Sequence, residues 1–126
     1  MTTILIIEDN EGIRENTAEL LELLHYKTLV ACNGSEGFQL AQKNHPDLIL
    51  CDMVMPETDG RMFLKLAKED LEVQHIPLIF FSAGSPSPDD QKYLMKQAKG
   101  YLAKPFSEEQ LKAEIEKGLN HNGDHR

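Results

Sequence analysis

Short apolar stretches rich in β-branched residues alternate with amphipathic helical patterns along this chain, and this alternation constrains its fold most. The stretch 3–7 is a nearly continuous apolar run, as expected for a strand buried on both faces of a parallel sheet. The segment after it places apolar residues from Ile13 to Leu24 at helical spacing. Strand and helix signals alternate five times, and parallel strands joined by helices require right-handed crossovers. We therefore predict one doubly wound α/β domain with a five-stranded parallel sheet and five helices on both faces.

The remaining element boundaries follow from turn and capping residues. Further strands are predicted at 28–32, 47–51, 78–81 and 101–103. The predicted helix caps are Asn33 or Ser35 for the second helix, Thr58 or Asp59 for the third, Ser87 before Pro88 for the fourth, and a Ser107–Gln110 capping box for the fifth. The segment 121–126 is polar and without periodicity, so we predict a domain over 1–120 and a disordered tail.

Composition and charge narrow the classes of function. The 126 residues include 13 basic and 21 acidic ones, a net charge of −8, and such a domain repels the phosphate backbone of nucleic acids. The apolar runs are too short to cross a bilayer, and the N-terminus lacks a signal-type segment, so we expect a cytoplasmic protein without membrane contact. Cys32 and Cys51 lie in or beside strand-like segments and are predicted to be buried, reduced thiols.

Polar residues that can take part in binding or catalysis follow four of the five predicted strands. Glu8 and Asp9 follow the first strand, and Asp52 follows the third. Ser82 follows the fourth strand, and Lys104 follows the fifth. Each residue alone has an ordinary structural explanation, as a helix cap, a turn hydroxyl or a solvated charge. Since the carboxyl ends of parallel strands meet at one edge of a sheet, their coincidence predicts a functional site there.

The chemistry of this set points to a divalent cation and a phosphoryl group. Three carboxylates packed together repel one another, and Mg²⁺ suits a site that offers one or two carboxylates and phosphate oxygens. Lys104 can neutralise a phosphoryl oxygen, and the hydroxyl of Ser82 can donate a hydrogen bond to another. Asp52 has no charge partner in its own segment and is a candidate nucleophile toward phosphorus.

Four motifs built on these residues match a known family. They are I-I-E-D at 6–9, D-L-I-L-C-D-M-V-M-P-E-T-D-G at 47–60, F-F-S-A at 80–83 and Y-L-A-K-P-F at 101–106. In this order and spacing they resemble the response-regulator receiver domains of two-component signalling, of the chemotaxis-regulator type. The resemblance runs from residue 3 to about 119 and implies a flavodoxin-like sheet of strand order 2-1-3-4-5.

The resemblance also implies a role for each site residue. Asp52 is the phosphoacceptor, and Mg²⁺ or Mn²⁺ is held by Glu8, Asp9, Asp52 and the backbone carbonyl of Val54. The phosphoryl group is contacted by Ser82, Ala83 and Lys104; Ser82 and Tyr101 form the switch; and the peptide bond between Lys104 and Pro105 is cis. Such a domain catalyses only its own phosphorylation and dephosphorylation and is not otherwise an enzyme.

The implied partners are proteins. A sensor histidine kinase or a phosphotransfer protein donates the phosphoryl group, and a downstream protein or a fused output domain receives the signal. The output surface is expected at about 88–120, from the fourth helix to the fifth, and a homodimer would form through the same surface.

Three other functions remain as alternatives. A phosphorylation-independent receiver would act as a protein-binding module, although the acid, Ser and Lys set is complete. A flavodoxin-like cofactor module needs a Ser/Thr/Gly-rich phosphate loop after the first strand, where this chain has Glu8-Asp9-Asn10-Glu11. A hydrolytic phosphatase with a nucleophilic Asp needs a second acid two residues after Asp52, and the chain has Val54 there.

Overall fold

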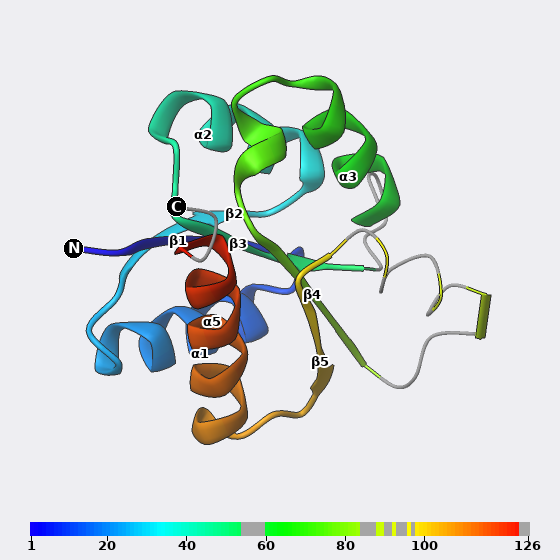
Figure 1. Ribbon diagram of the computed structural model, residues 1–126. Helices are drawn as coiled ribbons and strands as arrows, with labels where there is room; N and C mark the ends of the chain where they lie inside the picture. The colour runs from blue at the N-terminus through cyan, green and yellow to red at the C-terminus, as the bar shows by residue number, and fades with distance from the viewer. Residues whose placement is uncertain (54–59, 84–87, 90–91, 93–95, 97, 124–126) are drawn as a thin grey trace.

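The computed structural model contains a five-stranded parallel sheet covered by helices on both faces (Figure 1). It describes residues 1–53, 60–83, 88–89, 92, 96 and 98–123. The strand order is β2-β1-β3-β4-β5 and every pairing is parallel, which confirms the predicted fold class and sheet order. The strands are β1 (Thr3–Ile7), β2 (Lys27–Ala31), β3 (Leu48–Asp52), β4 (Leu78–Ala83) and β5 (Gly100–Lys104).

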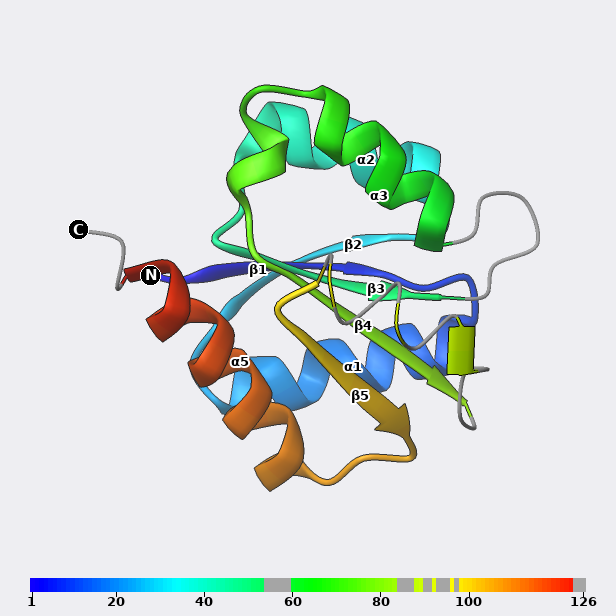
Figure 2. The same ribbon diagram turned by 45° about the vertical axis from the view of Figure 1, so that its right-hand side comes forward.

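The helices form one layer on each side of the sheet. Their bounds are α1 (Glu11–Leu23), α2 (Gly34–Asn44), α3 (Gly60–Glu69), the 3₁₀-helix η1 (Val73–His75) and α5 (Glu108–Gly123). Figure 2 shows α2 and α3 on one face and α1 and α5 on the other. In the predicted fourth helix, Pro88, Asp89, Lys92 and Lys96 are helical, whereas its predicted cap Ser87 lies outside the described residues.

Alternation along the buried strands divides the core into two layers. In β1, Leu5 and Ile7 pack with α2 and α3, while Ile4 and Ile6 pack with α1 and α5. All four side chains are fully buried. A strand with apolar side chains on both faces is typical of a sheet covered by helices on both sides, as the sequence predicted.

Local capping chemistry positions the helices. The side chain of Asn10 accepts a hydrogen bond from the backbone N–H of Ile13, and that of Asn33 accepts one from Glu36. Asn33, rather than Ser35, is thus the cap of α2. At α5 the predicted capping box forms in both directions, with Gln110 N–H donating to Ser107 Oγ at 3.0 Å and Ser107 N–H to Gln110 Oε1 at 2.9 Å. The predicted α3 caps, Thr58 and Asp59, lie outside the described residues.

Two predictions need correction, and one element was not predicted. Helix α5 extends to Gly123, into the predicted tail, because an established helix gains one backbone hydrogen bond for each added residue. Cys32 is exposed rather than buried, since it follows the edge strand β2, whereas Cys51 is buried in central β3. The 3₁₀-helix η1 was not predicted.

Within the described part of the chain, no helix is long and apolar enough to cross a bilayer.

Candidate functional site

The carboxyl ends of the strands bring the predicted polar residues to one edge of the sheet. Glu8 directly follows β1, Asp52 is the last residue of β3, and Lys104 is the last residue of β5. Ser82 lies inside β4, one residue beyond Phe81, which pairs with Asp52 in the sheet. The side chains come from four strands, and Glu8, Asp52 and Ser82 are 1%, 5% and 8% exposed. Buried charges of this kind need partners.

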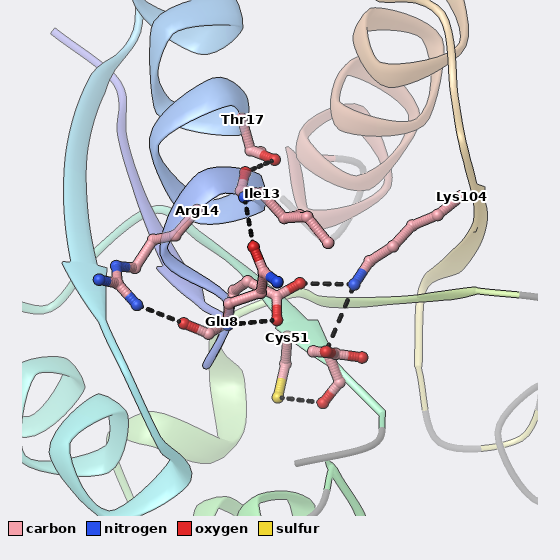
Figure 3. Close-up of polar contacts among 8 residues, drawn as sticks. Glu8, Ile13, Arg14, Thr17, Cys51 and Lys104 are labelled. Carbon is pink, nitrogen blue, oxygen red and sulfur yellow. Dashed lines mark hydrogen bonds and ion pairs between the residues drawn. The ribbon is translucent and has the colours of Figure 1, made fainter.

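Lys104 supplies the partner charge. Its Nζ lies 2.5 Å from Glu8 Oε1 and 3.3 Å from Asp52 Oδ2, so one ammonium group bridges two buried carboxylates (Figure 3). The lysine side chain is itself only 13% exposed. Its Nζ also lies 4.6 Å from the ring centroid of Phe81, a favourable cation–π distance. The peptide bond from Lys104 to Pro105 is cis.

Two residues that were not predicted hold Glu8 in place. The backbone N–H of Asn10 donates to Glu8 Oε2 at 3.1 Å, while the side chain of the same Asn caps α1. Arg14 Nη1 donates to the backbone carbonyl of Glu8 at 2.9 Å (Figure 3). The sequence signal for Asn10 is an Asn directly before a helical pattern. For Arg14 the only signal is its place one turn into that helix, which does not show where a long side chain will reach.

The acidic residues form a set of oxygen donors suited to a metal ion. Ligand oxygens of Glu8, Asp9 and Asp52 all lie within 4.8 Å of one another. Asp9 is exposed, whereas the other two are buried, so the group opens to solvent on the side of Asp9. Hard carboxylate oxygens with room for water match the preference of Mg²⁺. The predicted metal ligand Val54 lies outside the described residues.

The pKa of Asp9 reflects its burial first and the neighbouring carboxylate of Glu8 second. Partial burial raises the pKa of Asp9 above its ordinary value, and a hydrogen bond to Glu8 and the negative charge of Glu8 raise it further. The positive charge of Lys104 acts in the opposite direction but is the weaker influence. The folded state therefore holds a proton on Asp9 more tightly than the unfolded state does, and ionised Asp9 reduces stability as the pH rises through this raised pKa.

Asp9→Asn is accordingly expected to stabilise the metal-free protein. At pH 7 in EDTA we expect the free energy of unfolding to rise by about 0.2–1 kcal/mol, the range for an exposed charge pair. Urea denaturation of the variant and the wild type measures this difference. The gain should shrink as the pH falls toward 3.8, the ordinary pKa of the group, since the wild-type carboxyl is then protonated. A variant less stable than the wild type at pH 7 would contradict the repulsion described here.

Tyr101 is linked electrostatically to the same site. Burial raises the pKa of the Tyr101 phenol, and the negative charge of Asp52 raises it further. A hydrogen bond with the Ser82 side chain and the charge of Lys104 lower this pKa. The two predicted switch residues thus influence each other across the neighbouring strands β4 and β5. The ring of Tyr101 is partly buried beside the core layer shared with α2 and α3.

Ala83 is the last residue of β4 and pairs in register with Lys104. Of the residues predicted for the site, Glu8, Asp9, Asp52 and Lys104 thus lie together around one acidic group, and Ser82 connects that group to Tyr101.

A five-stranded parallel α/β domain with acids, a hydroxyl and a lysine at the ends of its strands defines the class of receiver domains. The sequence model of the response regulator receiver domain matches residues 4–116. The chain is 35% identical over 105 residues to the polar-differentiation response regulator DivK of Brucella ovis. The matched residues make up 83% of this chain and 85% of DivK.

Solved structures of receiver domains and related chemotaxis proteins have the same fold as this chain. A response regulator receiver domain protein from Clostridium thermocellum superposes with a TM-score of 0.90 at 25% identity over 100% of both chains. The chemotaxis protein CheY4 of Vibrio cholerae gives a TM-score of 0.88 at 28% identity over 94% of this chain and 99% of that one. The chain belongs to the response regulator receiver domain family of two-component signalling, as the motifs implied.

Proposed function

We propose that this domain accepts a phosphoryl group on Asp52 from a sensor histidine kinase or a phosphotransfer protein, with Mg²⁺ or Mn²⁺ bound beside it. The observation that carries the proposal is the convergence of three carboxylates and one ammonium group at the strand ends, centred on Asp52. The similarity to response regulators named for polar differentiation and chemotaxis supports the same signalling role.

The donor set fits the proposed cation. Glu8, Asp9 and Asp52 offer oxygen atoms, and the backbone carbonyl of Val54 is a further proposed ligand. When bound, the ion would supply positive charge that neutralises the carboxylates and the oxygens of an incoming phosphoryl group. Burial and the neighbouring carboxylate of Glu8 raise the pKa of Asp9, and a bound cation would act against both effects.

The residues of the chain then have distinct proposed roles. An oxygen of Asp52 attacks phosphorus, and a P–O bond forms while the P–N bond to the imidazole of the donor breaks, its electron pair leaving with the imidazole. Lys104, already 3.3 Å from Asp52, neutralises a phosphoryl oxygen. Ser82 and the backbone N–H of Ala83 donate hydrogen bonds to the remaining oxygens. Positioning and neutralisation of charge carry most of such a reaction.

The interaction between Ser82 and Tyr101 suggests how phosphorylation at Asp52 could change the surface at 88–120. If the hydroxyl of Ser82 turns to the phosphoryl group, Tyr101 loses a partner and its ring favours a different, more inward packing. Phosphorylation would then shift the population between two arrangements of the surface at 88–120. We propose that this surface binds a downstream protein, a fused output domain or a second copy of the chain, and that it does so in the cytoplasm. We also propose that the domain catalyses no reaction other than its own phosphorylation and dephosphorylation.

Intact mass after incubation with acetyl phosphate tests the proposal. We expect one added phosphoryl group in the presence of Mg²⁺ and none in EDTA. Asp52→Asn should abolish the adduct, whereas Asp89→Asn, the same change at an exposed Asp outside the site, should leave it intact. The adduct should be released by hydroxylamine, as an acyl phosphate is and a phosphoserine is not.

An adduct that survives in Asp52→Asn would place the acceptor elsewhere. Absence of any adduct with Mg²⁺ or Mn²⁺, and with a histidine kinase as donor, would favour the phosphorylation-independent binding module.

A further inference from the structure

Hydrogen bonds on both sides of Asp9 hold the turn between β1 and α1. Arg14 Nη1 donates to the backbone carbonyl of Glu8 at 2.9 Å, and the backbone N–H of Arg14 donates to the carbonyl of Asn10, also at 2.9 Å. The N–H of Asn10 donates to Glu8 Oε2 at 3.1 Å. On the side of the sheet, the N–H of Glu8 donates to the carbonyl of Ala31 in β2 at 3.0 Å. The two neighbours of Asp9 in the chain are therefore fixed, one to the sheet and one to the first turn of α1.

The bond from Arg14 to Glu8 also sets the direction of Asp9. A peptide unit is planar, so the carbonyl of Glu8 and the N–H of Asp9 lie in one plane. A donor that holds this carbonyl thus fixes the point from which the backbone of Asp9 continues. The donor is a cation, and hydrogen bonds of charged groups are roughly twice as strong as those between neutral groups. The bond is also partly buried, so water competes with it less than at an exposed site.

Arg14 acts on the main chain rather than on the carboxylates. Its partner Glu8 belongs to the acidic group, yet among the described residues Arg14 forms no ion pair, and its side chain donates to a neutral carbonyl. Figure 3 shows the guanidinium of Arg14 and the ammonium of Lys104 reaching Glu8 from different sides. Lys104 supplies positive charge to carboxylate oxygens, whereas Arg14 holds the backbone that carries them.

We propose that Arg14 is a positioning residue, which orients Asp9 for binding of a divalent cation. This inference rests on the proposed function, because it concerns the same group of metal ligands. Without the bond from Arg14, the peptide between Glu8 and Asp9 gains freedom to rotate. A cation that binds Asp9 must then order this peptide, and the lost conformational entropy weakens its affinity. Groups that orient a metal ligand in this way typically change metal affinity by about 10–100-fold.

A positioning role and a simple effect of charge predict opposite results. A cation beside an acidic site repels Mg²⁺, so removal of a residue that acted by its charge alone would strengthen Mg²⁺ binding. Removal of a residue that orients Asp9 weakens Mg²⁺ binding. The direction in which the Mg²⁺ dissociation constant changes in Arg14→Met therefore separates the two roles.

Titration of the ¹⁵N-labelled protein with MgCl₂, without a phosphodonor, measures this constant from the amide signals of Asp9 and Asn10. Arg14→Met keeps an unbranched stem without charge or donor, and we expect it to bind Mg²⁺ about tenfold more weakly than the wild type. Arg14→Lys keeps a charged donor on a stem of similar length and should bind more tightly than Arg14→Met. Lys112→Met removes an exposed charge from α5 and should bind like the wild type.

The Mg²⁺ affinity of the folded protein distinguishes positioning from a purely structural role. Urea denaturation in EDTA measures the stability of each variant, and a purely structural role would lower it without changing the Mg²⁺ dissociation constant. Unchanged or tighter Mg²⁺ binding in Arg14→Met would overturn the proposal. So would an Arg14→Lys protein that binds Mg²⁺ no better than Arg14→Met.

Phosphorylation of the same proteins tells the two proposals apart. At saturating Mg²⁺, Arg14→Met should form the adduct with acetyl phosphate at the rate of the wild type, because the bound cation then holds Asp9 in place. Wild-type protein that binds Mg²⁺ but forms no adduct would contradict the phosphorylation proposal alone. Wild-type protein that binds neither Mg²⁺ nor a phosphoryl group would overturn both.

Discussion

Lys104→Met is expected to lower the free energy of unfolding by about 3 kcal/mol at pH 7 in metal-free buffer, the cost of breaking a buried ion pair. The ammonium group bridges Glu8 and Asp52, which are 1% and 5% exposed, and its loss leaves two buried carboxylates without that charge. Met keeps an unbranched apolar stem beside Phe81, so the substitution removes mainly the charge. Urea denaturation measures the loss, and Lys112→Met on the exposed face of α5 is the control.

Conditions that replace the missing charge should reduce this loss. Mg²⁺ should restore part of the stability of Lys104→Met, because a cation at the acidic group substitutes for the ammonium. In a double-mutant cycle with Glu8→Gln, the two losses should not add, since both variants remove the same 2.5 Å interaction. Strict additivity would show that Lys104 stabilises the fold by another route.

Gly37→Ala is expected to lower the free energy of unfolding by about 1–3 kcal/mol, the cost of overpacking a core. Gly37 is a buried residue of α2, and a Cβ there would lie 2.6 Å from Ile7 Cγ1 and closer still to Cδ1. Ile7 is fully buried and directly precedes Glu8, so it has little freedom to move aside. The close approach of α2 to β1 therefore depends on the missing side chain.

Gly12→Ala is the control, and we expect it to raise the free energy of unfolding rather than lower it. Gly12 is exposed in α1, and the nearest atom to an added Cβ is Asn10 Oδ1 at 3.4 Å, an ordinary contact. The higher helix propensity of Ala should raise stability by up to about 1 kcal/mol. Thermal unfolding of both variants gives the comparison. If the Gly37→Ala protein were as stable as the Gly12→Ala protein, α2 could move away from Ile7 without a loss in the free energy of unfolding.

The sheet and the strand-end residues could be predicted because their signals are local. Asp52 follows an uninterrupted apolar run, and the capping residues Ser107 and Gln110 are three positions apart. Other features depend on contacts between distant segments. The partners of Lys104 lie 96 and 52 positions away, and no local pattern specifies which carboxylate its ammonium reaches.

The length of a side chain and the position of a strand in the sheet explain the remaining differences between the predictions and the structure. Arg14 was not assigned to the site because helical periodicity marks it only as a polar position, although it contacts the carbonyl of Glu8. The segment before Cys32 has the apolar pattern of a buried strand, yet β2 is an edge strand of the sheet and Cys32 is exposed. The closeness of Gly37 to Ile7 depends on the distance between a helix and a sheet, which only tertiary packing determines.

The ion pair between Glu8 and Lys104 also bears on biosynthesis. The two residues are 96 positions apart, and Lys104 ends β5, an edge strand that follows the other four strands of the sheet in sequence. A nascent chain emerging from the ribosome exposes Glu8 and Asp52 long before their counter-charge has been translated. Until then their mutual repulsion opposes docking of β1 against β3. Stable docking of β1 against β3 is thus electrostatically coupled to the arrival of Lys104 at the end of β5.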